Sequence, residues 1–183
     1  KWYPSYMISL SIGQGELMIT PIQMANLATI LANRGYYITP HIVRSINDST
    51  SSQIEKHVIP IARKHFDPIV EGMQMVIKEG TGRRAQIDSI TIAGKTGTVQ
   101  NPHGDDHSVF IAFAPVEDPK IALIVYVENG VWGSRYAAPI AGLLIEKYLK
   151  GKISDRKKPL EKEMFQGSLI HNTTSKVKET SNE

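Results

Sequence analysis

The chain has 183 residues, with 21 lysines and arginines, 18 acidic residues and no cysteine. The length allows one domain with a sizeable core, and the lack of cysteine excludes disulfides and thiolate metal sites. No apolar run approaches the ~18 residues that a membrane helix needs. The net charge of +3 lies entirely after residue 149, because residues 1–149 carry 13 basic and 13 acidic side chains, against 8 and 5 in the remainder. This distribution argues against a nucleic-acid partner.

The first predicted helix starts at Thr20-Pro21, where threonine is a favourable N-cap and proline suits the first helical position. Gly35 marks its end. Its apolar face is formed by Ile22, Leu27, Ile30 and Leu31. Just upstream, the GQG of residues 13–15 is interpreted as a tight turn leading into this helix, because a GxG pattern alone is weak support for a phosphate site.

The next stretch is expected to be extended and then helical. Residues 36–44 are typical of an extended segment broken by Pro40, and residues 47–52 of a polar loop. A second helix is predicted from Asp67 until Gly80 stops it, and GTGRRAQ, residues 80–86, is predicted to be a turn. The apolar stripe of this helix consists of Ile69, Val70, Met73, Val76 and Ile77.

Three strands are predicted at residues 90–99, 109–114 and 121–127, and the short connection between the last two suits antiparallel neighbours. The third strand is apolar on both faces, so helices are expected to cover it on both sides. One of these is the last predicted helix, residues 137–149. Its side chains available for burial are Ile140, Leu143, Leu144, Ile145 and Tyr148.

The stretch AGKTGTVQNPHGDDHS, residues 93–108, holds a lysine between a glycine and a threonine, a pattern with two unrelated meanings. A phosphate loop needs GxxxxGK[ST], but Ser89 stands where the first glycine should be. The residues that follow the lysine also favour a turn over the start of a helix. The sequence therefore favours the other meaning, part of a serine acyl-transfer site.

On a strand, the hydroxyls of Thr96 and Thr98 would point to one side, and Gly97 would leave room for another chain to lie close. Two hydroxyls with the charge of Lys95 nearby can hold a carboxylate, and backbone N–H groups can stabilise an oxyanion. These are the accessories that an acyl-transfer site needs.

The KTG pattern accompanies SxxK and SxN in serine transpeptidases and β-lactamases. Five blocks occur here in order: SIGQGELMITPIQMANLATILANRG from Ser11, GTGRRA from Gly80, AGKTGT from Ala93, HSVFIAFAP from His107 and AAPIAGLLIEKYL from Ala137. Over about residues 11–149 the chain resembles the C-terminal part of the transpeptidase domain of class B penicillin-binding proteins. It is most similar to the penicillin-binding protein 2 group of the cell-elongation machinery.

The resemblance implies an α+β fold, an antiparallel sheet with helices on both faces, and assigns residues 1–150 to the C-terminal portion of that domain. Some strands would come from upstream sequence, one of them pairing with strand 121–127. Residues 151–183 are expected to be a charged polar tail, disordered after about residue 170. The resemblance also implies peptidoglycan cross-linking, in which a serine attacks the D-Ala-D-Ala bond of a stem peptide and passes the acyl group to an amine, and in which β-lactams trap the same serine.

Carried onto this sequence, the resemblance gives Lys95 the role of a positive charge in the site, and Thr96 and Thr98 the binding of the substrate's terminal carboxylate. The N–H of Thr98 would be one oxyanion-hole donor, and Gly97 would keep the strand open. No cofactor is implied.

The chain carries no credible nucleophile. Formal SxxK matches at residues 154–157 and 175–178, and an SxN match at residues 45–47, fall outside the family order and are interpreted as chance. The serine and its lysine are expected upstream of Lys1, and the chain, which starts without methionine, is expected to be a fragment or a processed piece. We expect it to be inactive alone, and unstable or aggregated because strand 121–127 would have an unpaired apolar edge.

The parent is expected to be a membrane-anchored D,D-transpeptidase on the periplasmic side of the bacterial inner membrane, anchored by sequence upstream of this chain. A polytopic membrane glycosyltransferase is the expected partner. A D,D-carboxypeptidase or β-lactamase-type serine hydrolase is an alternative, because it shares the strand and differs only in that water takes the acyl group. A non-catalytic penicillin-binding sensor module, which keeps the fold without the serine, is another.

A cluster of titratable residues follows the KTG strand. His103, Asp105, Asp106 and His107 lie within five positions and have side chains that can bind zinc. The segment NPHGDDH is better interpreted as an exposed hairpin connection, so no metal is predicted. Asp106 and His107 are instead predicted to line the rim of the cleft, and Trp132 to lie in a loop near it.

Overall fold

The computed structural model describes residues 3–15, 17–43, 45–46, 49–50 and 55–169. The predicted disorder after residue 170 and the serine match at 175–178 lie outside the described residues, as does most of the predicted loop at 47–52. Within the described part, no helix is both long and apolar enough to cross a membrane.

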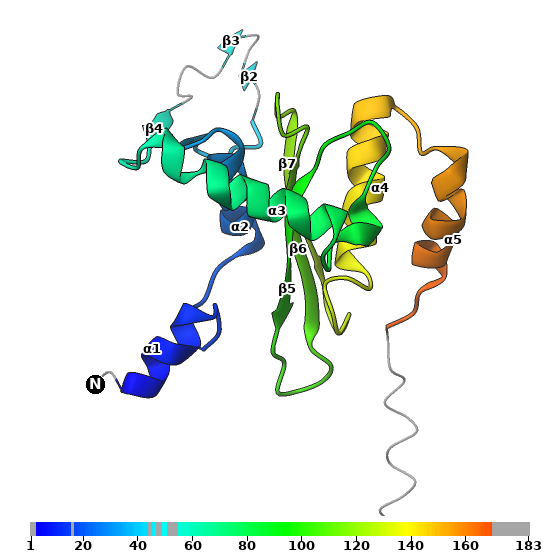
Figure 1. The fold of residues 1–183 in the computed structure, drawn as a ribbon, viewed down its shortest axis with the longest axis horizontal. Helices are drawn as coiled ribbons and strands as arrows, with labels where there is room; N and C mark the ends of the chain where they lie inside the picture. Colours follow the sequence, from blue (N-terminus) through cyan, green and yellow to red (C-terminus); the bar gives the residue numbers. More distant parts are fainter. Residues whose placement is uncertain (1–2, 16, 44, 47–48, 51–54, 170–183) are drawn as a thin grey trace, which may run out of the picture.

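A three-stranded antiparallel sheet forms the centre of the fold (Figure 1). Its strands are β5 (Ala93–Val99), β6 (His107–Ala114) and β7 (Ile121–Val127), in the order β5-β6-β7. Short connections join neighbours, as predicted. The predicted first strand begins three residues late, because Ile87 and Ile90 form a bridge across a turn ahead of it. Strand β6 has a neighbour on both edges, and all its residues after the first are buried.

Helices cover both faces of the sheet. On one face, α2 (Pro21–Ala32) and α3 (Asp67–Lys78) bury Leu31, Val70 and Phe113 in one apolar cluster. On the other face, α4 (Ala137–Lys150) buries Ile145 with Phe110 in a second cluster. The odd-numbered residues of β7 pack against this second cluster, and Ala122 packs against the first. The predicted α+β arrangement, with helices on both sides of the third strand, is confirmed.

The helix boundaries follow the local signals in the sequence. The Gln23 side chain accepts from the N–H of Thr20 at 2.8 Å, which forms a capping box at the start of α2. The chain leaves α2 through Gly35, whose φ of 112° favours glycine. GTGRRAQ forms a turn followed by the 3-10 helix η2 (Arg83–Ala85).

The buried faces of the helices match the prediction in part. In α2, Leu31 is buried and Ile30 packs against the first cluster as predicted, whereas Ile22 and Leu27 are exposed and Ala28 and Ala32 are buried instead. Ile69 of α3 is also exposed. In α4, Leu143 and Ile145 are buried as predicted, but Leu144 and Tyr148 are exposed and Glu146 is buried in their place.

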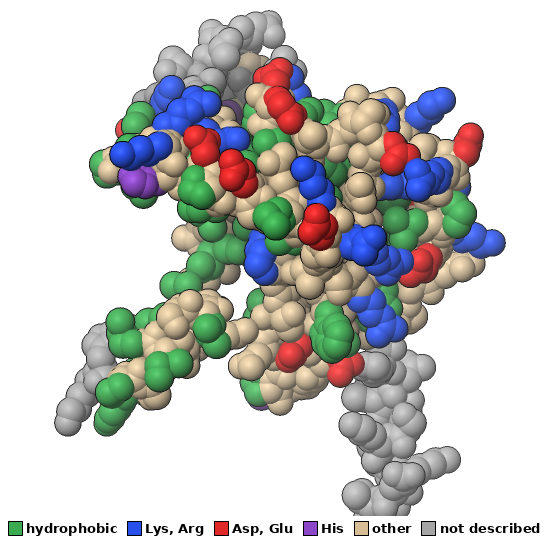
Figure 2. All heavy atoms as spheres, in the orientation of Figure 1, with side chains coloured by type: hydrophobic (Ala, Val, Ile, Leu, Met, Phe, Trp, Pro, Cys, Tyr) green, Lys and Arg blue, Asp and Glu red, His purple; other side chains and the backbone are tan. Residues whose placement is uncertain are grey.

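The remaining elements lie around this body. The amino-terminal helix α1 stands away from the sheet, buries no residue and carries apolar side chains on its surface (Figures 1 and 2). β1 pairs with β4, and β2 with β3. The predicted extended segment 36–44 is a strand only in its first three residues. The elements that lie around the central sheet and its covering helices are α1 (Pro4–Ser11), β1 (Tyr36–Ile38), β2 (Ser45–Ile46), β3 (Ser49–Thr50), β4 (Lys56–Val58) and η1 (Arg63–His65).

The chain continues past α4 into the 3-10 helix η3 (Asp155–Lys157) and α5 (Lys158–Gln166). Both carboxylate oxygens of Glu163 accept from Arg84 at 2.7 Å, and Arg156 pairs with Asp88 at 2.6 Å. The described beginning of the predicted tail is therefore helical and lies against the body. The domain boundary at residue 150 stays a prediction.

Candidate active site

The outer edge of β5 is open, because among the described residues this strand pairs only with β6. In an antiparallel strand the N–H and C=O of one residue point to the same edge, and successive residues alternate. The carbonyl of Thr98 accepts from the amide of Gln14 at 3.0 Å, and that of Thr96 from the ammonium of Lys95 at 2.7 Å. Both carbonyls therefore face the open edge, and the N–H groups of the two threonines face it with them.

The hydroxyls of Thr96 and Thr98 lie on the face of the sheet that α4 covers. Thr96 is directly opposite Phe110 and Thr98 is directly opposite Ser108, and residues that face each other across a ladder share a face. Lys95 and Gly97 are on the other face, where Lys95 is exposed and bends toward the strand edge. The predicted sidedness of the two threonines is thus present in the structure, and their roles stay predictions.

Thr81 is a site residue that sequence reasoning missed. Its hydroxyl oxygen lies 2.6 Å from that of Thr96, from the turn between α3 and η2. Two hydroxyls at this distance share one hydrogen bond, so when Thr81 donates, the O–H of Thr96 is free to donate to an anion. The GTG pattern that contains Thr81 was visible in the sequence, but nothing in it indicated a contact with a residue 15 positions away.

A loop after β7 packs against β5 at the level of Thr96. At Gly133 an added Cβ would lie 2.5 Å from the carbonyl oxygen of Val109 and 3.1 Å from the Cβ of Thr96, so only glycine fits. Trp132, beside it, is exposed. At Gly97 an added Cβ would meet Val109 at an ordinary 3.5 Å, so contacts within the chain do not require glycine there. Its predicted role in leaving room for a substrate stays a prediction.

Ser108 of β6 fixes this loop from inside the protein. Its hydroxyl donates to the carbonyl of Trp132 at 2.9 Å and accepts from the N–H of Ala137 at 3.2 Å. The side chain is fully buried. One hydroxyl thus joins the central strand, the loop beside Thr96 and the start of α4.

Asp106 and His107 lie at the hairpin end of β5 and β6 and hold the other side of the same loop. The Asp106 carboxylate accepts from the N–H of Asn101 at 3.1 Å, and the backbone carbonyl of Asp106 accepts from the N–H of Val131 at 2.8 Å. The N–H of Asn129 donates to Nδ1 of His107 at 3.1 Å, which leaves the ring proton on Nε2. Among the described residues, no three His, Cys, Asp or Glu side chains are placed to hold a metal ion. The assignment of Asp106 and His107 to the cleft rim stays a prediction.

The formal nucleophile match at residues 154–157 is placed at η3, beside the carboxyl end of α4. The KTG strand packs against α3 and against the loop that contains Gly133, away from this hollow. In the described residues, Ser154 therefore lies beside a separate hollow, consistent with the interpretation of this match as chance.

Residues 1–146 match the family described as penicillin binding protein transpeptidase domain. The chain belongs to the penicillin-binding protein transpeptidase family. It is 32% identical over 182 residues to the peptidoglycan D,D-transpeptidase MrdA of Acinetobacter baumannii, and this match covers 87% of the chain but 26% of MrdA. The chain thus spans about a quarter of the length of this curated relative.

Two solved structures support the membership. The crystal structure of Pseudomonas aeruginosa PBP2 in complex with WCK 5153 superposes with a TM-score of 0.73 at 35% identity, over 86% of this chain and 36% of that one. A chain from a peptidoglycan synthase complex that coordinates polymerization and crosslinking superposes with a TM-score of 0.74 at 29% identity, over 84% of this chain and 27% of that one. The predicted similarity of this chain to the penicillin-binding protein 2 group is confirmed.

Proposed function

We propose that the chain is the C-terminal portion of the catalytic domain of a peptidoglycan D,D-transpeptidase, and that it binds the donor stem peptide along the open edge of β5. One observation carries the proposal. The backbone groups of Thr96 and Thr98 face an edge that no described strand occupies, while their hydroxyls share one face of that strand. The similarity to MrdA supplies the substrate class.

The site residues have the following roles in the proposed reaction. A serine from upstream sequence attacks the carbonyl of the D-Ala-D-Ala bond, and the N–H of Thr98 donates to the oxygen that becomes negative. The terminal D-alanine leaves with a proton, and an amine of a neighbouring stem then attacks the acyl ester and restores the serine hydroxyl. The hydroxyls of Thr96 and Thr98 hold the terminal carboxylate, and Lys95 adds positive charge at the edge.

Thr81 orients the donor that meets the carboxylate. If Thr81 donates to Thr96 across the 2.6 Å contact, the proton of Thr96 is directed at the substrate instead of at the protein. Gln14 holds the carbonyl of Thr98, which is the acceptor that a backbone N–H of an edge-binding peptide would use. Productive binding therefore requires the Gln14 amide to give up this bond or to share the acceptor.

β-lactams would acylate the same serine, as the name of the family indicates. The parent would act at the periplasmic side of the inner membrane, anchored by sequence outside this chain. Its partner would be a membrane glycosyltransferase, and the similarity to a chain of a synthase complex that coordinates polymerization and crosslinking supports this. A serine hydrolase that passes the acyl group to water is the second candidate, because the β5 geometry serves both reactions.

The test uses the full-length parent and a fluorescent penicillin. We expect a covalent label on the parent and none on this chain alone, since the nucleophile lies outside it. An absence of label on correctly folded parent would refute the proposal. Incubation with stem peptide and an acceptor amine separates the two candidates, because a transpeptidase forms the cross-linked dimer and a hydrolase releases only the shortened free acid.

A further inference from the structure

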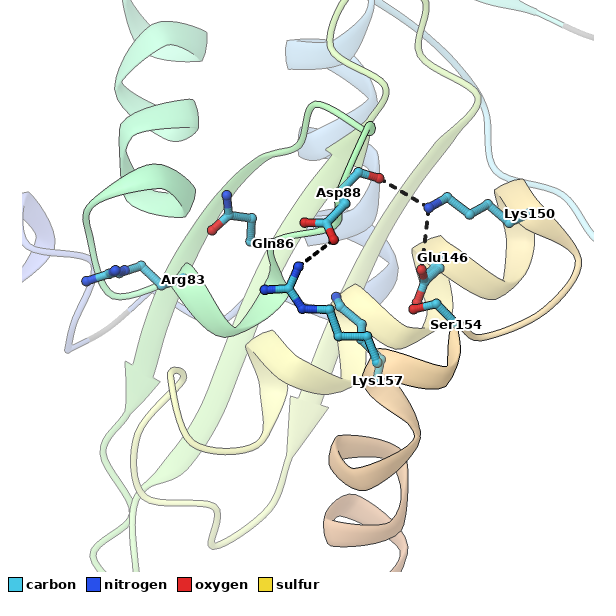
Figure 3. A pocket seen from close by; sticks show the side chains of 8 residues that line it. Arg83, Gln86, Asp88, Glu146, Lys150, Ser154 and Lys157 are labelled. Atoms are coloured by element: carbon cyan, nitrogen blue, oxygen red, sulfur yellow. Dashed lines mark hydrogen bonds and ion pairs between the residues drawn. The ribbon is translucent and has the colours of Figure 1, made fainter.

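A charged hollow of about 310 Å³ lies on the far part of α4 from the site (Figure 3). Four cationic side chains line it, against two acidic ones, so the lining carries two more positive than negative charges. The six are Arg83, Lys150, Arg156 and Lys157, with Asp88 and Glu146. Figure 2 shows that lysine and arginine side chains also gather on the surface over α4 and α5. None of the KTG residues lines the hollow.

Two buried polar atoms at this hollow have no hydrogen-bond partner among the described residues: Oε2 of Glu146 and Nζ of Lys157. Glu146 is only 1% exposed, and its other carboxylate oxygen has Lys150 at a long 3.5 Å. Burial lowers the pKa of Lys157, and the nearby Glu146 carboxylate only partly opposes this effect. An unpaired buried charge is costly, so both atoms favour a ligand that completes their hydrogen bonds.

Two of the other cations at the hollow, Arg156 and Lys150, already have acceptors. Arg156 pairs with the Asp88 carboxylate at 2.6 Å, and Lys150 donates to the Asp88 carbonyl at 3.1 Å (Figure 3). A ligand must therefore accept a hydrogen bond from Lys157 and donate one to Glu146. The lining as a whole carries more positive than negative side chains, which favours an anion as this ligand.

We propose that this hollow binds a phosphate group that retains a proton, either as hydrogen phosphate or as a singly protonated phosphate monoester. Its ionised oxygens accept from Lys157 and from the Ser154 hydroxyl on the lining, and its P–O–H donates to Oε2 of Glu146. Sulfate has the same tetrahedral shape but no proton to donate at neutral pH. Glu146 therefore makes the site selective for phosphate over sulfate. The site is independent of the proposed transpeptidase activity.

The test is titration calorimetry on the full-length parent with inorganic phosphate, glycerol 1-phosphate and sulfate at constant ionic strength and pH. We expect saturable binding of phosphate with one site per chain. The affinity for sulfate should be lower by about tenfold or more, which corresponds to the loss of one hydrogen bond to a charged group. Binding of glycerol 1-phosphate at a pH where it is singly protonated would indicate an ester as ligand, and its failure would restrict the site to free phosphate.

Three variants test the assignment to these residues. Lys157→Met should abolish phosphate binding, whereas Lys147→Met, on an exposed position of α4, should leave it unchanged. Glu146→Gln should bring the affinities for phosphate and sulfate together, because an amide can donate to either ion. Circular dichroism checks that each variant is folded, and the Lys157→Met arm decides the matter if Glu146→Gln does not fold. Equal affinities in the wild type, or unchanged phosphate binding in Lys157→Met, would overturn the proposal.

Discussion

Replacement of Ser108 by alanine removes one oxygen atom and two hydrogen bonds, to the carbonyl of Trp132 and from the N–H of Ala137. Each hydrogen bond contributes a net stabilisation of about 1 kcal/mol, and a buried polar group left without a partner costs about 1–3 kcal/mol. Because Ser108 is fully buried, water cannot replace the hydroxyl without rearrangement. We expect Ser108→Ala to lower the free energy of unfolding by about 2–4 kcal/mol.

Urea denaturation of the full-length parent measures this change as a shift of the midpoint at constant slope. Ser11→Ala is the matched control, because its hydroxyl is exposed and donates to the carbonyl of Ile8, and its effect should stay within about 0.5 kcal/mol. Acylation by penicillin should also slow in Ser108→Ala, since the loop that packs on Thr96 is released. A loss of stability below about 0.5 kcal/mol would refute the argument that this hydroxyl fixes the loop.

Three further predictions concern the β5 strand and the chain as a whole. Thr96→Val and Thr98→Val should each lower the rate constant of acylation by a fluorescent penicillin about tenfold or more, which corresponds to the loss of one hydrogen bond to a carboxylate. The control Thr39→Val, at an exposed position, should leave this rate constant unchanged. Rates equal to wild type in the first two variants would show that the two hydroxyls do not bind the ligand. Gly94→Ala places a Cβ 2.5 Å from the ring of Phe110 and should cost about 1–3 kcal/mol in thermal or urea unfolding, and an equally stable variant would contradict this packing. The isolated chain should aggregate or unfold without cooperativity, because apolar side chains on α2 and one edge of β7 are exposed, and a monomeric, cooperative melting transition would count against this.

The parts of the fold predicted from sequence are those with local chemical signals. Thr20-Pro21 indicated the start of α2 and Gly35 its end, because capping depends on a few neighbouring residues. Asp67-Pro68 indicated the start of α3 through its proline in the first turn, although Phe66 and not Asp67 is the N-cap residue. The strand β7 was predicted with its exact ends from its run of apolar residues. Its apolar side chains on both faces also predicted helices on both sides of the sheet.

The parts that sequence reasoning missed depend on contacts between distant segments. Ile22 and Tyr148 have the spacing of a buried face but are exposed, and Glu146 is buried, because tertiary packing sets which face of a helix meets the sheet. Thr81 and Gln14 contact β5 from 15 and 84 positions away, and no local pattern indicates such a pair. The KTGT pattern predicted the shared face of its threonines, but not which edge their backbone groups use.

The structure of the full-length parent acylated by a β-lactam tests the central claim most directly. We predict that the acyl carbonyl oxygen lies about 3 Å from the backbone nitrogen of Thr98, with the carboxylate of the ligand within hydrogen-bond distance of the Thr96 and Thr98 hydroxyls. An adduct whose carbonyl and carboxylate lie away from the open edge of β5 would contradict the account.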